Sequence, residues 1–304
     1  MGKRIRVRRS TLLVGFLGLL LACLGLFSAP VPAQTISELE QLQVTEYVLD
    51  AGPLFVRSAI IEGPTEMGLV DTQFTKSNAH RLVADLIEKG KDLKWVYITH
   101  PHLDHFNGSE IIHQAFPAAR FYGQPEALEE LPFMVNTRQA SLGTAAPGGI
   151  ANLPDQAPLF VEALPSEILA IDDRPVQIVA GVGDHPKSSF VWVEDAKTVI
   201  MGDIAFGDTH AFIGDHRDFE GWITTLDAAK ALDPKTVIVG HAEPAARYGA
   251  EALDAQIAWI EDLQSAIAQE DSPEAVEVAM IAKYPNYAND FIFQFSYGVE
   301  RFSE

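Results

Sequence analysis

The sequence predicts an α/β fold in which helices cover the outer faces of two β-sheets, and two observations lead to this prediction. Short β-rich runs are followed by strand–helix alternation in both halves of the 304-residue chain, an order typical of sheets covered by helices. Four of the β-rich runs end next to a histidine or an aspartate, and scaffolds commonly present reactive side chains where a strand gives way to a loop.

Each predicted element follows from residue type and spacing. Strands are assigned to runs rich in β-branched and aromatic residues, and helices to segments with apolar residues at helical spacing. The expected strands are residues 44–49, 54–61, 67–70, 93–98, 119–122, 176–180, 190–193, 198–201 and 236–239. The expected helices are residues 79–89, 109–115, 220–231, 250–269 and 273–283. The first helix is expected to begin at a cap formed by Ser77 or Asn78 and to end at Gly90.

Residues 1–33 have the pattern of a secretory signal peptide. Five basic residues precede an apolar run from Leu12 to Phe27, and Val31-Pro32-Ala33 is a small-residue cleavage signal. The apolar run is shorter than the roughly 20 residues of a stable spanning helix. We therefore expect export to the periplasm or the exterior, as one domain over residues 34–304 with extra C-terminal helices at about 250–283.

The leader also admits other routes. An uncleaved N-terminal anchor, twin-arginine export through Arg8-Arg9 and lipoprotein anchoring at Cys23 are the alternatives. Cys23 is the only cysteine of the chain, and cleavage after Ala33 would remove it. A mature domain without a thiol fits an oxidising compartment.

The chain is strongly acidic. It has 22 basic and 42 acidic residues, a formal net charge of −20, and loss of the leader's five basic residues would leave −25. Such a surface repels phosphate backbones, so we do not expect a nucleic-acid partner. The expected partner is a small-molecule substrate, with no stable membrane insertion after leader cleavage. The sequence does not indicate the oligomeric state.

A dense group of potential metal ligands follows the predicted strand 93–98. The segment His100-Pro101-His102-Leu103-Asp104-His105 has the pattern H-x-H-x-D-H, and imidazoles and carboxylates are ligands of zinc and related metals. Three further candidates, each just beyond a predicted strand, are His185, Asp203 and His241. Four strand ends that carry such residues predict a shared metal site.

This ordered set resembles the metallo-β-lactamase superfamily, and the resemblance covers nearly the whole predicted mature chain. It implies an αβ/βα sandwich of four layers, with two central sheets and a metal site at one edge between them. By position, it implies one metal bound by His100, His102 and His185, a second bound by Asp104, His105 and His241, and a bridge between them formed by Asp203.

The resemblance implies two divalent metal ions, with zinc expected and iron or manganese as alternatives. Two cations that share a water lower its pKa, and the resulting bridging hydroxide would attack an acyl or phosphoryl centre whose developing charge the metals stabilise. Asp104 is expected as a second catalytic group that passes a proton to the leaving group. His210 resembles a catalytic or pocket histidine of relatives with a G-D…H-x-[FYW] run.

Further candidates lie around this site. Lys187 is expected to bind a substrate carboxylate and Tyr122 to line the pocket, with a solvated lysine and a buried strand tyrosine as the alternatives. Asp71 is expected to orient a ligand histidine, because metal-bound imidazoles usually donate their other N–H. Residues 132–158 show little periodicity and are expected to form an irregular lid or pocket wall.

Some positions depart from patterns in the superfamily. Where the family often reads G-H-T-P-G-S around its third histidine, residues 184–189 read D-H-P-K-S-S, so we expect His185 to be a ligand in a loop of altered shape. His102 stands where flavodiiron members carry a glutamate, and Asp203 stands where many true β-lactamases carry cysteine or serine. These differences favour the lactonase, thioesterase and glyoxalase-like members.

The leading hypothesis is an exported, dinuclear metal-dependent hydrolase of ester-like bonds, namely a lactone, a thioester or a β-lactam. The second is an iron-dependent oxidoreductase of the same fold, such as a persulfide dioxygenase, because two histidines and one carboxylate can bind non-haem iron. A metal-stabilised binding protein without turnover is the third. A nuclease is disfavoured by the acidic charge and the lack of a basic groove.

Overall fold

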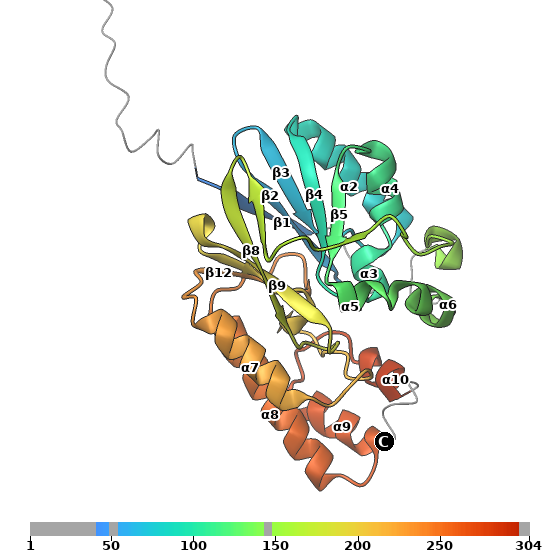
Figure 1. Ribbon diagram of the computed structural model, residues 1–304. Coiled ribbons are helices and arrows are strands. Elements are labelled where there is room, and N and C mark those ends of the chain that lie inside the picture. The colour runs from blue at the N-terminus through green and yellow to red at the C-terminus, as the bar shows by residue number, and fades with distance from the viewer. Residues whose placement is uncertain (1–40, 49–53, 143–147, 298–304) are drawn as a thin grey trace, which may run out of the picture. The chain divides into compact units, whose positions relative to one another are not determined.

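Two β-sheets form the centre of the described residues, which are 41–48, 54–142 and 148–297 of the computed structural model (Figure 1). The first sheet runs in chain order: β1 (Gln43–Val48), β2 (Arg57–Glu62), β3 (Glu66–Val70), β4 (Asp92–Ile98), β5 (Arg120–Gly123) and β6 (Glu162–Ala163). The second sheet has the order β12 (Thr236–Ile238), β10 (Thr198–Ile200), β9 (Ser188–Val193), β8 (Arg174–Gly181) and β7 (Ile168–Ile171). A short parallel ladder joins β11 (Phe206–Gly207) to β13 (His241–Ala242).

Helices cover the outer face of each sheet (Figure 1). The helices of the first half are α2 (Lys76–Lys89), α3 (Leu103–Phe106), α4 (Ser109–Ala115), α5 (Pro125–Leu128) and α6 (Leu131–Leu142). Those of the second half are α7 (Phe219–Lys230), α8 (Glu251–Gln269), α9 (Pro273–Lys283) and α10 (Phe291–Tyr297). Short 3₁₀ turns are η1 (Gly149–Asn152), η2 (Glu194–Ala196) and η3 (Gly202–Ile204).

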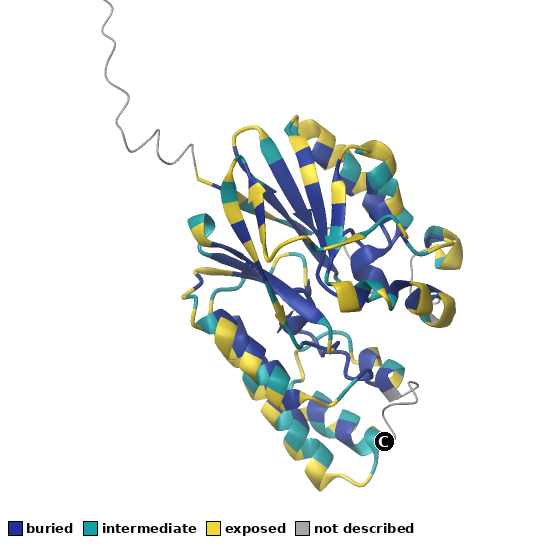
Figure 2. Ribbon diagram, in the orientation of Figure 1, coloured by how far each residue is buried: buried dark blue, intermediate teal, exposed yellow. Residues whose placement is uncertain are grey.

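Strand β4 shows why the layers form in this order. Successive strand residues point to opposite faces, and Trp95 and Tyr97 enter the core between the sheets whereas Val96 and Ile98 enter the core beneath the helices. The indole N–H of Trp95 also donates a hydrogen bond to the carbonyl of Ala170 across the sheets, at 2.9 Å. The inner strands are buried and the outer helix faces exposed (Figure 2), so the predicted αβ/βα sandwich is confirmed.

The first predicted helix is confirmed with an earlier start. Helix α2 begins at Lys76 because the side chain of Thr75, rather than that of Ser77 or Asn78, accepts a hydrogen bond from the Asn78 N–H at 3.2 Å. Gly90 ends it in the left-handed conformation, with φ 65°, as expected for a helix C-terminus. The predicted C-terminal helices are also present as α8 and α9.

The prediction that residues 132–158 are irregular is wrong for residues 132–142, which belong to α6 (Leu131–Leu142). Its buried residues Leu131, Met134, Val135 and Gln139 fall at helical spacing. Pro132 and the polar Gln139 obscured this pattern in the sequence, although proline is tolerated in the first helical turn.

The predicted signal peptide, residues 1–33 with Cys23, lies outside the described residues. The chain divides into residues 1–39 and residues 40–304, and all described residues belong to the second unit. Within the described part of the chain, we find no helix with the length and apolar character needed to cross a membrane.

Candidate metal centre

The candidate ligands lie in loops and turns at one edge of the two sheets. His100 and His102 follow β4, and α3 then carries Asp104 and His105. The remaining candidates come from the second half: Asp184 lies between β8 and β9, Asp203 in η3 after β10, and His241 in β13 after β12. Because β10 and β12 are parallel neighbours, their ends deliver Asp203 and His241 side by side.

Two glycines allow the second-half loops to approach each other closely. Gly202 has φ 49°, and a Cβ there would lie 2.6 Å from the Thr99 hydroxyl oxygen. A Cβ at Gly240 would lie 1.9 Å from Oδ1 of Asp203. Only glycine fits both positions without displacing a site residue.

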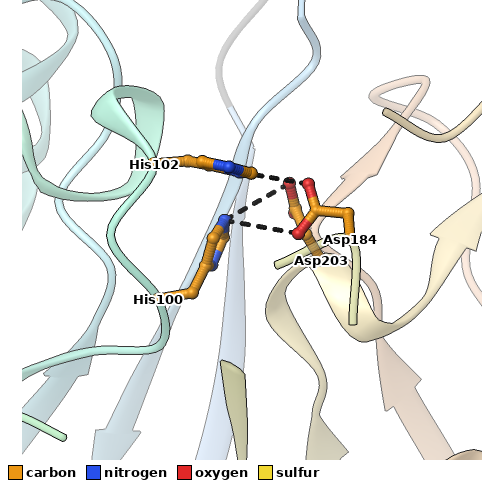
Figure 3. Close-up of side chains that lie close together, drawn as sticks. All are labelled: His100, His102, Asp184 and Asp203. Carbon is orange, nitrogen blue, oxygen red and sulfur yellow. Dashed lines mark ion pairs between the residues drawn. The ribbon is translucent and has the colours of Figure 1, made fainter. Parts of the chain in front are cut away.

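The side chains form two groups that share Asp203. The first group is His100, His102, Asp184 and Asp203, and Figure 3 shows both rings directed at the two carboxylates. Nδ1 of His102 lies 3.1 Å from Oδ2 of Asp184, and Nε2 of His100 lies 3.6 Å from Oδ2 of Asp203 and 3.9 Å from Oδ1 of Asp184.

The second group is Asp104, His105, Asp203 and His241. Nε2 of His105 lies 3.1 Å from Oδ1 of Asp203, and Nε2 of His241 lies 3.0 Å from the other oxygen of that carboxylate. Oδ2 of Asp104 lies 3.3 Å from Nε2 of His241 and 3.7 Å from Nε2 of His105. All four members are buried.

Each histidine of the two groups uses its outer ring nitrogen in a hydrogen bond. His102 donates from Nε2 to Asp215 at 2.7 Å, His105 from Nδ1 to Asp71 at 2.7 Å, and His241 from Nδ1 to the carbonyl of Leu54. Nδ1 of His100 lies 3.0 Å from the hydroxyl of Thr99, whose own proton goes to Asp71 at 2.8 Å. This network assigns the proton of every neutral ring to its outer nitrogen and leaves the inner nitrogen as an acceptor.

The inner atoms fit divalent metal ions. Several buried atoms have no hydrogen-bond partner within the described part of the chain: Nε2 of His100, both oxygens of Asp184 and Oδ1 of Asp203. Buried polar atoms are almost always paired, and imidazole nitrogens and carboxylate oxygens are suitable metal ligands. Each group would supply two imidazole nitrogens and two carboxylates, counting the shared Asp203 in both, so the clusters suit a dinuclear metal site.

Electrostatics at the centre favour added positive charge. Burial, with the nearby carboxylates of Asp203 and Asp215, raises the pKa of Asp184 to about 7, against the lowering effect of His102. Burial would lower the pKa of His105, but the charges of the surrounding aspartates raise it well above its ordinary value. Cations bound between these carboxylates would neutralise them.

The sequence profile of the metallo-beta-lactamase superfamily matches residues 51–241, which include all the candidate ligands. The chain belongs to this superfamily. No curated protein matches the sequence.

Solved structures share the fold at low sequence identity. A metallo-beta-lactamase family protein from Thermus thermophilus is 16% identical with a TM-score of 0.58, over 84% of this chain and 92% of that one. A beta-lactamase domain protein from Burkholderia ambifaria is 15% identical with a TM-score of 0.62, over 84% and 82%. The metallo-beta-lactamase FIM-1 from Pseudomonas aeruginosa, solved in a mono-zinc form, is 15% identical with a TM-score of 0.53, over 72% and 91%.

Six of the seven predicted ligands come together, but His185 stays outside both groups. Its Nε2 lies 3.1 Å from Oε2 of Glu130, and its Nδ1 accepts a hydrogen bond from the Lys187 N–H at 3.1 Å. In the first group, the place expected for His185 is taken by the carboxylate of its neighbour Asp184.

Two signals in the sequence could have identified Asp184. An ungapped comparison of residues 183–188, G-D-H-P-K-S, with the superfamily's G-H-T-P-G-S matches the glycine, the proline and the serine and sets Asp184 at the histidine. Asp184 also directly follows a glycine, as Asp203 and His241 do.

Among the other predicted residues, Asp71 has the expected place, because its carboxylate accepts from His105. Lys187 and Tyr122 do not line the cavity beside the metal groups. Lys187 forms an ion pair with Glu130 at 2.7 Å, and Tyr122 is half-buried against the core between the sheets.

His210 lines the cavity, as does Asp104. The indole N–H of Trp259 donates to Nδ1 of His210 at 3.3 Å, which assigns the ring proton to Nε2. Burial lowers the pKa of His210 to about 4, so its ring is neutral at pH 7. Its Nε2 has no hydrogen-bond partner in the described part of the chain and lies 3.7 Å from Oδ1 of Asp290.

The cavity beside the two groups is mostly apolar. Including its opening to solvent, it holds about 580 Å³ of empty space, and Asp104, Asp184, Asp203 and His241 lie on its wall. Its apolar wall residues include Leu103, Met134, Phe206, Phe212, Ile292 and Phe295. Arg138 on α6 is also on the wall and forms an ion pair with Asp215 at 3.0 Å. The helix that replaced the predicted loop therefore forms part of the pocket wall.

Proposed function

We propose that the protein is a dinuclear metal-dependent hydrolase of an ester-like bond: a lactone, a thioester or a β-lactam. The observation that carries this proposal is the pair of groups around Asp203, whose acceptor atoms converge beside the cavity. Two divalent metals bound there would activate a water and polarise the substrate oxygen. Zinc is the first metal to test, because the similar FIM-1 protein was solved in a mono-zinc form.

The chain's own residues would position the substrate and exclude bulk water. The apolar wall formed by Met134, Phe212 and Phe295 would hold an apolar substituent of the substrate next to the two groups. Asp104 faces both the second group and the cavity, which is the place from which a carboxylate could hand a proton to a leaving group. His210 would donate a hydrogen bond from Nε2 to a substrate oxygen.

A substrate screen on metal-loaded protein tests this proposal. Apo protein is reconstituted with zinc and assayed against lactones, thioesters, β-lactams and phosphoesters, each with a short and a long apolar substituent. We expect about two metal equivalents per chain, hydrolysis of one ester-like class, and a lower KM for the substrate with the long apolar substituent in each pair. A metal-free protein that hydrolyses the same substrate at the loaded rate would contradict the proposal.

A second candidate function is an iron-dependent oxidoreductase of the same fold. The observation in its favour is that His100, His102 and Asp184 provide two imidazoles and one carboxylate, a ligand set typical of non-haem iron. Iron-loaded protein that consumes oxygen with a thiol persulfide, and that fails to hydrolyse any ester-like substrate, would favour this function over the first.

We further propose that the protein acts outside the cytoplasm on a small molecule. The basic and apolar pattern of residues 1–33 supports export. Cell fractionation with N-terminal sequencing tests this: we expect the exported protein to begin at Gln34. Retention of the intact N-terminus in the membrane fraction would support an anchor instead.

A further inference from the structure

Asp184 is held at the centre by its backbone and not by its side chain. Its N–H donates to the carbonyl of Asp203 at 3.0 Å, and the Nε2–H of His216 donates to the carbonyl of the preceding Gly183 at 2.7 Å. Gly183 itself packs so closely that a Cβ there would lie 2.7 Å from the carbonyl oxygen of Asp203. The main chain therefore fixes the carboxylate opposite His100 and His102.

The carboxylate of Asp184 faces the inner ring nitrogens of His100 and His102. Nδ1 of His102 lies 3.1 Å from Oδ2 of Asp184, while Nε2 of the same ring pairs with Asp215 at 2.7 Å. Both oxygens of Asp184 are buried and accept no hydrogen bond from the described residues. An imidazole nitrogen and a carboxylate oxygen this close can bind the same metal ion.

His185 lies beside the first group, with its ring centroid 5.3 Å from that of His102, but its ring nitrogens face other partners. Its Nδ1 accepts from the Lys187 N–H and its Nε2 faces Glu130, whose other oxygen is paired with the Lys187 ammonium group at 2.7 Å. Both ring nitrogens therefore have partners outside the two groups, although Nε2 also lies 4.0 Å from Oδ2 of Asp215, the partner of His102. For His185 to become a ligand, these contacts would have to break and the loop would have to turn.

We propose that Asp184, and not His185, is the third terminal ligand of the first group, and that this substitution shifts its metal preference from zinc toward manganese or iron. Each group then has two imidazoles, one terminal carboxylate and a share of Asp203. The centre has three carboxylates, whereas the superfamily pattern with a third histidine has two. Carboxylate oxygens suit harder cations than imidazole nitrogens do.

The inference rests on the metal centre of the proposed function but not on its hydrolytic activity. Metal content can therefore support or overturn it even if no substrate is hydrolysed, and failure of the substrate screen leaves it intact.

The test compares the full chain with three variants: D184N, D184H and H185Q. Each is stripped of metal and exposed without oxygen to equal amounts of Zn²⁺, Mn²⁺ and Fe²⁺, and bound metals are counted by mass spectrometry. We expect H185Q to bind about two equivalents with the wild-type metal ratio, and D184N to lose about one. D184H should keep both and show a several-fold higher share of zinc.

Cobalt substitution provides a second readout that separates ligation from folding. Visible absorption of Co²⁺-loaded protein should change in D184H and stay the same in H185Q, while circular dichroism shows both variants folded. If H185Q lost one metal equivalent and D184N kept both, the ligand assignment would be overturned. That result would mean that Asp184 forms only an ion pair with His102. An unchanged zinc share in D184H would overturn the metal preference.

Discussion

The two groups of the metal centre contain the same types of ligand but are supported in different ways. In the second group, the outer nitrogens of His105 and His241 are held by Asp71 and by the carbonyl of Leu54, both close to the first sheet. In the first group, His102 depends on Asp215, which lies in the loop before α7 and is paired with Arg138 of the pocket wall. The comparison shows that equal donor sets can be oriented by different parts of the fold: residues next to strands of the first sheet in the second group, and a residue of the loop before α7 for His102 in the first group.

The groups are also linked to each other. Asp71 accepts from His105 and from the hydroxyl and N–H of Thr99, and that hydroxyl oxygen lies 3.0 Å from Nδ1 of His100. One buried carboxylate therefore orients a histidine of each group, directly in the second and through Thr99 in the first. Asp215 contacts only the first group in this way.

The largest effect is expected where the two groups meet. Because Asp203 is shared, D203N should lower metal binding in both groups and reduce kcat/KM by more than about 10³-fold, beyond the loss of a single stabilising donor. Metal analysis and steady-state kinetics measure this change. D155N alters an exposed aspartate and should match the wild type. If D203N lost metal from one group only, the shared role of Asp203 would be wrong.

The outer partners distinguish the two groups. D71N should weaken metal binding in both groups, whereas D215N should weaken it only in the first, each by about 10- to 100-fold, as observed for other partners of metal-bound histidines. Titration with a competing chelator, followed by metal analysis, shows whether one or both metal ions are bound more weakly. If D71N and D215N each weakened the binding of only one metal equivalent, and by the same factor, Thr99 would not couple the two groups.

A buried histidine outside both groups offers a comparison that does not depend on metal. Burial lowers the pKa of His210 from 6.5 to about 4, so the unfolded chain binds a proton more readily between these pH values. Stability contributed by this residue is complete above pH 6.5 and is lost as the pH falls toward 4. At pH 5 the loss is about 2 kcal/mol.

Denaturant unfolding of metal-free protein at pH 7 and pH 5 measures this dependence. H210Q should reduce the difference between the free energies of unfolding at pH 7 and pH 5. H80Q, at an exposed position, should leave that difference as in the wild type. If H210Q retained the full difference, the acid sensitivity would arise from the aspartates and histidines of the two groups instead.

The sequence revealed the residues that form continuous or strand-end motifs more readily than those placed by loops. The H-x-H-x-D-H segment, Asp203 and His241 were assigned to a shared site because each follows a predicted strand, and the fold brings them together. Asp184 was missed because a histidine stands next to it and loop register decides which side chain turns inward. The pocket wall from α6 was missed because Pro132 and Gln139 interrupt its apolar pattern.

The contribution of Thr99 could not be predicted at all, because it depends on two hydrogen bonds that only the folded chain creates. T99V keeps the shape of the side chain and removes both, so His100 loses the partner of its outer nitrogen. A net loss of about 1 kcal/mol corresponds to about fivefold weaker metal binding in the first group. The second group should change less, since His105 keeps its direct bond to Asp71. Chelator titration of T99V measures the metal affinity of both groups. A larger loss of affinity in the second group would mean that Thr99 acts mainly by holding Asp71 in place.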